Sequence, residues 1–438
     1  MDHKMLARYP IGNPRRKWRQ DNFVLGLASP GAMTLDEPSE LSRKKTRRGV
    51  KTAIDAGFDM MGCLWANSTI AMDIVRAAEQ YGGSVLFQDM LRFGGMGDKR
   101  IFCQQNDYKG AIRDTEKWHA VKGYIMWDEP ILPEHLETTR QMIDYCERVR
   151  PDMLPYTVAN PDYHRLCRWE DGLYEAYINR FLDTLDPAQM DFDYYPIGKS
   201  EYDAAQQLDN STMFSCLEIV RRAAAAREIP FWFYYQGQHF PWHKVQYHFT
   251  FPMVRAMAFS GVLHGVKCLN LYTEFDGYVD PATGGKGVFF EEQKRLNAEL
   301  HALGNTLMAL NCLRVIHDDT LLPDHPTMVG YRTALAESEL LLAEKPLPRR
   351  ISISEHSDAY GNRYLMVLNR DYECAAHLAL TLKSPSHVFE VSKSDGEQHF
   401  SYENTVNLPV TLAPGDLALY RIQPATEAPF TVEYYLDK

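Results

Sequence analysis

An apolar run that stops at two acidic residues is the clearest chemical signal in the sequence. Residues 123–130 read GYIMWDEP, so a run typical of a buried parallel strand is followed by Asp128, Glu129 and a proline that starts a loop. A carboxyl group at the end of such a strand is well placed to transfer a proton. We expect Glu129 to be a general acid and Asp128 to orient Glu129 or a substrate. The structural alternative is that Glu129 only caps the next helix or forms a salt bridge.

A second carboxyl group is required if the chemistry is hydrolysis of a glycosidic bond. One carboxyl then protonates the leaving oxygen, and the other attacks the anomeric carbon or activates water. The run 265–274 also ends in an acid, so Glu274 is the first choice for nucleophile or base. Asp193 is the second choice, because alternation in MDFDYYP (190–196) places Asp191 and Asp193 on one face with Asp193 nearer the end. The alternative for Asp193 is a structural carboxylate that holds a loop.

Amide and aromatic side chains at the ends of other apolar runs are candidates for binding a substrate. The run FWFYYQGQH (231–239) is nearly all aromatic and ends in amides, which both donate and accept hydrogen bonds. For the middle of this run, packing in a core is the simpler interpretation. The candidates for substrate contact are Trp65, Asn67, Asp128, Asn160, Tyr195, Gln236, Gln238 and Tyr272.

The scaffold that these positions predict is a (β/α)8 TIM barrel over residues 1–315. Short apolar runs alternate with amphipathic stretches, and parallel strands of a barrel bring their carboxyl ends to one face. The expected strands are residues 23–27, 58–65, 84–88, 124–127, 153–158, 190–195, 230–235 and 265–273. The expected helices are residues 43–56, 68–81, 109–119, 133–148, 172–185, 210–227, 251–263 and 291–310.

The sequence pattern changes after about residue 315 to the two-residue period of half-buried strands. Turn residues such as Tyr360-Gly361-Asn362 and Ser394-Asp395-Gly396 separate these runs. We therefore expect a small antiparallel β-sandwich domain over residues 316–438. Its expected strands are residues 350–354, 363–369, 377–382, 406–412 and 416–422.

Composition narrows the classes of partner. A formal net charge of −11 argues against nucleic acid or an anionic membrane as a partner, and no apolar run reaches the ~20 residues of a membrane helix. The N-terminus lacks a secretory signal, and the eight cysteines show no CxxC, which favours a reduced, cytoplasmic protein. His239, His243 and His248 are spaced like a weak metal cluster but lack an HExxH motif. We expect no metal and no cofactor, and leave a homo-oligomer open.

Several segments together resemble a known group of enzymes. They are GYIMWDEP (123–130), MDFDYYP (190–196), MFSCLEIVRRAAAAREIPFWFYYQGQ (213–238) and RAMAFSGVLHGVKCLNLYTE (255–274). They are similar to the TIM-barrel glycoside hydrolases of the large retaining superfamily, in the style of β-galactosidase and glycoside hydrolase families 5 and 42, and most of all to gut-bacterial members with a C-terminal β-sandwich. The runs YLMVLNRDYECAAHLALTL and VTLAPGDLALYRI resemble that sandwich.

The resemblance implies an acid/base residue at the end of the fourth strand, where Glu129 stands. It also implies a nucleophile at the end of the seventh strand, where the sequence has Gln236. Either the strand count is off by one and Glu274 fills the role, or the second carboxyl group has moved, or it has been lost.

The sequence as a whole predicts a bacterial glycosidase, an O-glycosyl hydrolase that acts on an oligosaccharide or small glycoside with two carboxyl groups. Its partner is a carbohydrate substrate. Two alternatives remain open. One is a catalytically inactive carbohydrate-binding barrel, which the glutamine at the seventh strand makes plausible. The other is a metal-dependent barrel lyase or isomerase.

Overall fold

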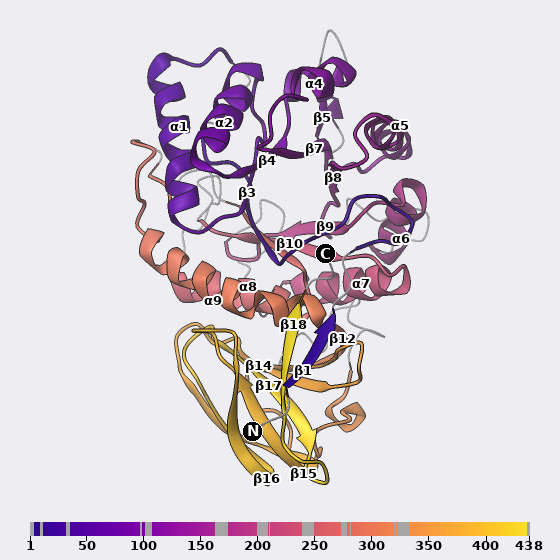
Figure 1. Cartoon of the computed structure of the whole chain (residues 1–438), viewed down its shortest axis with the longest axis vertical. Helices are drawn as coiled ribbons and strands as arrows, with labels where there is room; N and C mark the ends of the chain where they lie inside the picture. The colour runs from indigo at the N-terminus through magenta and orange to yellow at the C-terminus, as the bar shows by residue number, and fades with distance from the viewer. Residues whose placement is uncertain are drawn as a thin grey trace.

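The computed structural model describes residues 4–8, 12–31, 36–96, 99–100, 107–162, 174–198, 209, 211–238, 249–272, 278–280, 282–318, 321 and 333–435. It consists of a barrel surrounded by helices and a β-rich domain attached to one side (Figure 1). No helix within the described residues is long and apolar enough to cross a membrane.

Within the described residues, eight parallel strands form the barrel. In chain order they are β2 (Val24–Leu27), β3 (Met60–Gly62), β4 (Ser84–Phe87), β7 (Val121–Asp128), β8 (Leu154–Val158), β9 (Met190–Tyr194), β10 (Phe231–Gln236) and β11 (Cys268–Tyr272). Neighbouring strands pair in parallel from β2 round to β8 and from β2 back through β11 to β9. A bridge between Ala159 and Phe192 joins β8 to β9 and closes the ring. The predicted TIM barrel is therefore confirmed.

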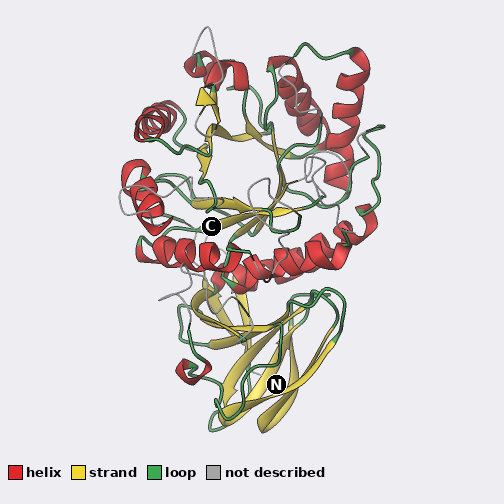
Figure 2. Cartoon of the chain, turned by 180° about the vertical axis from the view of Figure 1, so that it is seen from behind, coloured by secondary structure: helices red, strands yellow, loops and turns green. Residues whose placement is uncertain are grey.

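Helices lie outside the ring and cover the strands (Figure 2). They are α1 (Glu40–Asp55), α2 (Ser68–Tyr81), α3 (Met90–Phe93), α4 (Tyr108–Asp114), α5 (Pro133–Val149), α6 (Tyr174–Leu185), α7 (Met213–Ala226), α8 (Phe251–Leu263) and α9 (Phe290–Ala309). A short hairpin of β5 (Gly95–Met96) and β6 (Lys99–Arg100) extends the sheet beside β7. Local signals set several helix ends: Asn67 caps the start of α2, and Pro133 occupies the first turn of α5.

Each barrel strand divides its side chains between two cores. Phe231, Phe233 and Tyr235 of β10 pack outward against helices, whereas Trp232 and Tyr234 fill the barrel interior. Because successive residues of a strand point to opposite faces, the interior cluster takes every second residue. The inward residues nearest the carboxyl ends are the ones that can meet a ligand.

The C-terminal domain is a sandwich-like antiparallel sheet, as predicted. Within residues 311–435, its strand order is β12 (Asn311–His317), β13 (Ile351–Ser357), β14 (Arg363–Asn369), β17 (Leu417–Pro424), β15 (Ala376–Val391) and β16 (Gln398–Leu412). A register shift between Thr381 and Ser386 lies midway along the long pair β15–β16. Leu365, Val367, Leu408 and their neighbours form the core of this domain. A short 3-10 turn, Leu335–Glu337, precedes β13.

Three strands of this region were not expected from the sequence. They are β12, β1 (Lys4–Arg8) and β18 (Thr431–Tyr435), of which the last two pair in parallel although they lie at opposite ends of the chain. A short edge strand depends on a partner far away in sequence, so local periodicity does not reveal it. β12 crosses the division predicted at residues 315 and 316, and that division stays a prediction.

Helices α8 and α9 lie between the barrel and the C-terminal domain (Figure 1). Arg255 of α8 binds both Asp416 beside β17, at 2.7 Å, and Glu299 of α9, at 2.6 Å. Gly396, in the turn between β15 and β16, packs against α9 so closely that an added Cβ would lie 2.1 Å from the carbonyl oxygen of Ala302. The contact requires a residue without a side chain.

We expect Gly396→Ala to destabilise the protein more than Gly361→Ala. Both glycines have positive φ, +75° and +84°, so each alanine incurs the left-handed penalty of roughly 1–2 kcal/mol. Only Gly396 has a neighbour in the way; nothing lies within 4 Å of a Cβ at Gly361. The clash should add about 1–3 kcal/mol. Urea unfolding of the two variants measures the difference, and equal losses would contradict a close domain contact.

Candidate active site

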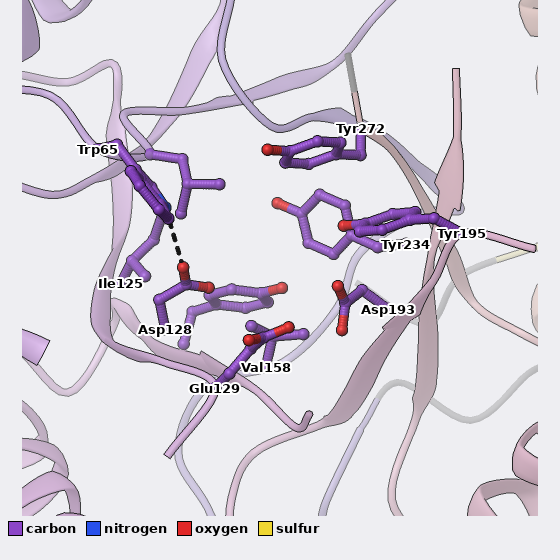
Figure 3. A pocket seen from close by; sticks show the side chains of 11 residues that line it. Trp65, Ile125, Asp128, Glu129, Val158, Asp193, Tyr195, Tyr234 and Tyr272 are labelled. Carbon is purple, nitrogen blue, oxygen red and sulfur yellow. Dashed lines mark hydrogen bonds between the residues drawn. The ribbon is translucent and has the colours of Figure 1, made fainter. Parts of the chain in front are cut away.

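Three acidic side chains meet at the carboxyl ends of two barrel strands. Asp128 ends β7, Glu129 follows it, and Asp193 lies near the end of β9; all three point into one cavity (Figure 3). The cavity encloses about 100 Å³. It is lined by Leu64, Trp65, Ile125, Asp128, Glu129, Tyr156, Val158, Asp193, Tyr195, Tyr234 and Tyr272.

Trp65 fixes the first of these acids. Its indole Nε1 donates to Oδ2 of Asp128 at 3.1 Å across the carboxyl end of the intervening strand β4. Trp65 has φ of +55°, which is a rare conformation for a bulky residue. Such strain persists only where the surroundings impose it, and it is concentrated at functional sites.

Glu129 is held in a similarly unusual conformation. Its φ is +54°, although the residue before a proline normally adopts an extended backbone. Asn160, just beyond β8, donates from Nδ2 to Oε2 of Glu129 at 2.9 Å. Asn160 is itself fixed, because its backbone N–H donates to Tyr177 and its carbonyl accepts from Tyr174, both at 3.0 Å. The carboxyl group is therefore aimed by the backbone and by an amide.

The carboxyl groups of Glu129 and Asp193 face each other in the cavity and interact electrostatically (Figure 3). Burial is the main reason that the pKa of Glu129 is well above its usual range, and the negative charges of Asp193 and Asp128 raise it further. Burial, together with the charge of Asp128, raises the pKa of Asp193 to about 7. Burial also raises the pKa of Asp128 to about 6, against the opposing bond from Trp65. Facing carboxyl groups with raised pKa values titrate together, so the pair retains a proton close to neutral pH.

Asp193→Asn should stabilise the folded protein at alkaline pH. An aspartate titrates near ~3.9 in the unfolded chain and at about 7 here, so the folded state binds more protons and its stability falls as the pH rises through this window. An asparagine never carries the charge that burial penalises, so we expect a gain of a few kcal/mol as an upper bound. Thermal unfolding from pH 4 to pH 8 measures it.

The gain should largely disappear near pH 4, where the folded aspartate is protonated and the unfolded one is about half protonated. Asp21→Asn is the control because Asp21 is exposed and lies outside the cavity lining. A variant that is less stable than the parent protein at pH 8 would contradict the buried, charge-repelled environment of Asp193.

Aromatic rings form much of the remaining wall. Tyr195 and Tyr272 lie 4.8 Å apart at 32°, facing Trp65 across the cavity (Figure 3). Two lining tyrosines, Tyr156 and Tyr234, were not among the predicted contacts. The alternation that selected Asp193 also places both of them on the inward face, and this signal could have found them.

Four predicted contact residues lie outside the cavity lining: Asn67, Asn160, Gln236 and Gln238. Asn67 caps α2, since its Oδ1 accepts from the backbone of Ile70 at 2.9 Å. The amide of Gln236 is fully buried and binds the backbone of Ile197 and of Gln238. Gln238 is buried beside it. Glu274 lies outside the described residues, as do His239, His243 and His248.

The strand count predicted from the sequence is confirmed. β7 is the fourth barrel strand and carries Glu129 at its end, and β10 is the seventh and ends at Gln236. The explanation that the count is off by one is therefore wrong, because Glu274 follows the eighth strand. Among the described residues, no group of three or more His, Cys, Asp or Glu is arranged to hold a metal ion.

The fold is similar to that of solved glycoside hydrolases. A Bacteroides fragilis protein assigned as an alpha-galactosidase superposes with a TM-score of 0.51 at 10% identity, covering 92% of this chain and 79% of its own. A family 51 alpha-L-arabinofuranosidase from Bifidobacterium longum gives a TM-score of 0.43 at 12% identity, with coverages of 96% and 97%. A Bacteroides thetaiotaomicron protein assigned as an alpha-L-fucosidase gives a TM-score of 0.44 at 14% identity. The match covers 68% of this chain and 97% of the other.

At this identity the similarity concerns the fold alone. Neither a protein-family model nor a curated protein sequence matches the chain. The chemistry must therefore be argued from the cavity itself.

Proposed function

We propose that the protein hydrolyses a glycosidic bond, with Glu129 as general acid and Asp193 as the second carboxyl group. The observation that carries this proposal is the pair of buried, facing carboxyl groups of Glu129 and Asp193 inside a cavity walled by tyrosines. A pair of buried carboxyl groups with raised pKa values keeps one proton available for a leaving group near neutral pH.

The division of roles follows from the environment of each group. Glu129 faces two neighbouring negative charges and burial, so it is the one that retains the proton. Interactions with Glu129 and Tyr195 favour the charged form of Asp193 and hold its pKa down against burial. Asp193 is thus the carboxylate of the pair, suited to attack the anomeric carbon or to activate water.

The spacing of the two carboxyl groups in the complex with substrate would set the stereochemical outcome. Retaining enzymes separate the carboxyl groups by ~5–5.5 Å and inverting ones by ~6.5–9.5 Å. A sugar bound between Glu129 and Asp193 would place its glycosidic oxygen beside Glu129. The proton of Glu129 would then pass to that oxygen as the glycosidic bond breaks.

The walls of the cavity support a carbohydrate as substrate. Trp65, Tyr195 and Tyr272 offer flat apolar faces, and Asp128, fixed by Trp65, offers a carboxylate to a hydroxyl group. We place the protein with the large retaining superfamily that its sequence resembles, in a branch whose second carboxyl group has moved from the seventh strand to the sixth.

Purified protein assayed on a panel of aryl glycosides and oligosaccharides tests the proposal. Hydrolysis that Asp193→Ala and Glu129→Gln remove would support it. Glu274 remains the competing second carboxyl group, and loss of activity in Glu274→Ala with normal activity in Asp193→Ala would transfer the role. Sugar binding without any hydrolysis would favour the carbohydrate-binding barrel, which Gln236 at the seventh strand already suggests.

A further inference from the structure

Gln88 carries a buried amide without a hydrogen-bond partner in the part of the chain that the structure describes. The side chain is 0% exposed, and within the described residues neither Nε2 nor Oε1 has a hydrogen-bond partner. Buried polar groups are normally paired, because an unpaired one has lost its bonds to water without replacement. An amide whose nitrogen and oxygen both lack a partner among the described residues is therefore available to bind a ligand.

The sheet register places this amide at the level of the cavity. Leu86 of β4 pairs with Gly62 of β3 on one side and with Gly123 of β7 on the other. The ladder continues past these pairs, since the N–H of Cys63 donates to the carbonyl of Leu86 at 3.1 Å, and Phe87 pairs with Tyr124. Two residues beyond Leu86, Gln88 therefore stands between Leu64 and Ile125.

Both of these neighbours line the cavity. Leu86 belongs to the interior cluster that also contains Leu64 and Ile125, whereas Phe87 packs outward. By the two-residue period, Gln88 points to the same interior face as Leu86. Gln88 itself is not part of the cavity lining; its amide is covered beside Leu64 and Ile125, one strand from Trp65 and one strand from Asp128.

We propose that Gln88 is a substrate-binding residue that reads hydroxyl groups of the sugar at the floor of the cavity. This inference rests on the proposed function, and it narrows the substrate to a sugar whose buried edge carries free hydroxyl groups. An amide presents a donor and an acceptor side by side, which matches two neighbouring hydroxyl groups. To meet the ligand, the buried amide has to turn about the side-chain torsions of Gln88 into the space between Leu64 and Ile125.

Replacing Gln88 with leucine removes the amide and keeps a similar volume. We expect the midpoint of thermal unfolding to stay the same or to rise, because an unsatisfied polar group has left the interior. We expect KM for the best 4-nitrophenyl glycoside to rise roughly 10-fold, as for a lost hydrogen bond in a buried site. Gln88→Ala provides the same comparison if leucine does not fit.

Gln189→Leu is the matched control. Gln189 is also a buried glutamine with an unpartnered Oε1, but it precedes β9 at the opposite end of the barrel. Its replacement should leave KM unchanged. Monodeoxy analogues of the glycoside then identify the hydroxyl group that Gln88 binds. For the parent protein, kcat/KM should be roughly 10-fold lower on one analogue than on the full substrate. For Gln88→Leu, kcat/KM should be the same on that analogue and on the full substrate.

An equal penalty for every deoxy analogue in both proteins would overturn the assignment. So would a lower unfolding midpoint with unchanged KM, which would mean that Gln88 holds only a buried water. If the parent protein hydrolyses no glycoside, the proposed function fails by itself. Gln88 is then tested by thermal shifts with D-galactose, D-glucose, L-arabinose and L-fucose, and a shift that persists in Gln88→Leu, or no shift in the parent protein, would refute the inference.

Discussion

Glu129→Gln is expected to lower kcat by about 10²–10⁴-fold on a glycoside with a poor leaving group. Glutamine keeps the size of the side chain and can still meet Asn160, but it has no proton to transfer. The loss should be much smaller on a 2,4-dinitrophenyl glycoside, whose leaving group departs without protonation. Steady-state kinetics on the two substrates measure the contrast.

Glu134→Gln provides the control for this first prediction. Glu134 is an exposed acid in the first turn of α5, five residues further along the chain and outside the cavity lining. It should leave both rates unchanged. Equal losses on the two substrates in Glu129→Gln would show that Glu129 binds or positions the substrate without acting as an acid.

Asp193→Ala should lower kcat by a similar factor, about 10²–10⁴-fold or more, because the second carboxyl group is removed. Added azide occupies the space that the side chain leaves, and it should restore release of the activated leaving group while forming a glycosyl azide. NMR of that product and of the product formed by the parent protein reports the anomeric configuration. A retained product from the parent protein identifies Asp193 as nucleophile, and an inverted one identifies it as base.

The same experiment decides between the two candidates for the second carboxyl group. Asp193 faces Glu129 in the cavity, whereas Glu274 lies outside the described residues. We expect Glu274→Ala to retain most of the activity and to form no glycosyl azide. Rescue by azide in Glu274→Ala and none in Asp193→Ala would assign the chemistry to the eighth strand. The stability and kinetic measurements together should show that Asp193 lowers the stability of the folded protein at alkaline pH and is required for turnover.

The sequence by itself determined the barrel and the position of Glu129. Strands and helices alternate along the sequence with the spacing of a parallel sheet covered by outer helices. The predicted bounds of α2 and α8 match the observed ones to the residue. These signals are local: an apolar run ending in Asp128, Glu129 and Pro130 marks a strand end whatever the rest of the chain does. The alternation in 190–196 likewise placed Asp193 on the inward face.

Only the tertiary structure decided which of these strand ends meet. Whether Asp193 or Glu274 approaches Glu129 depends on the closure of the ring between β8 and β9, which is set by pairing between segments far apart in sequence. The hydrogen bonds that turn Gln236 away from the cavity are equally non-local, since Ile197 lies 39 positions away. The raised pKa values follow from burial beside other charges, and no single segment of the chain contains that burial.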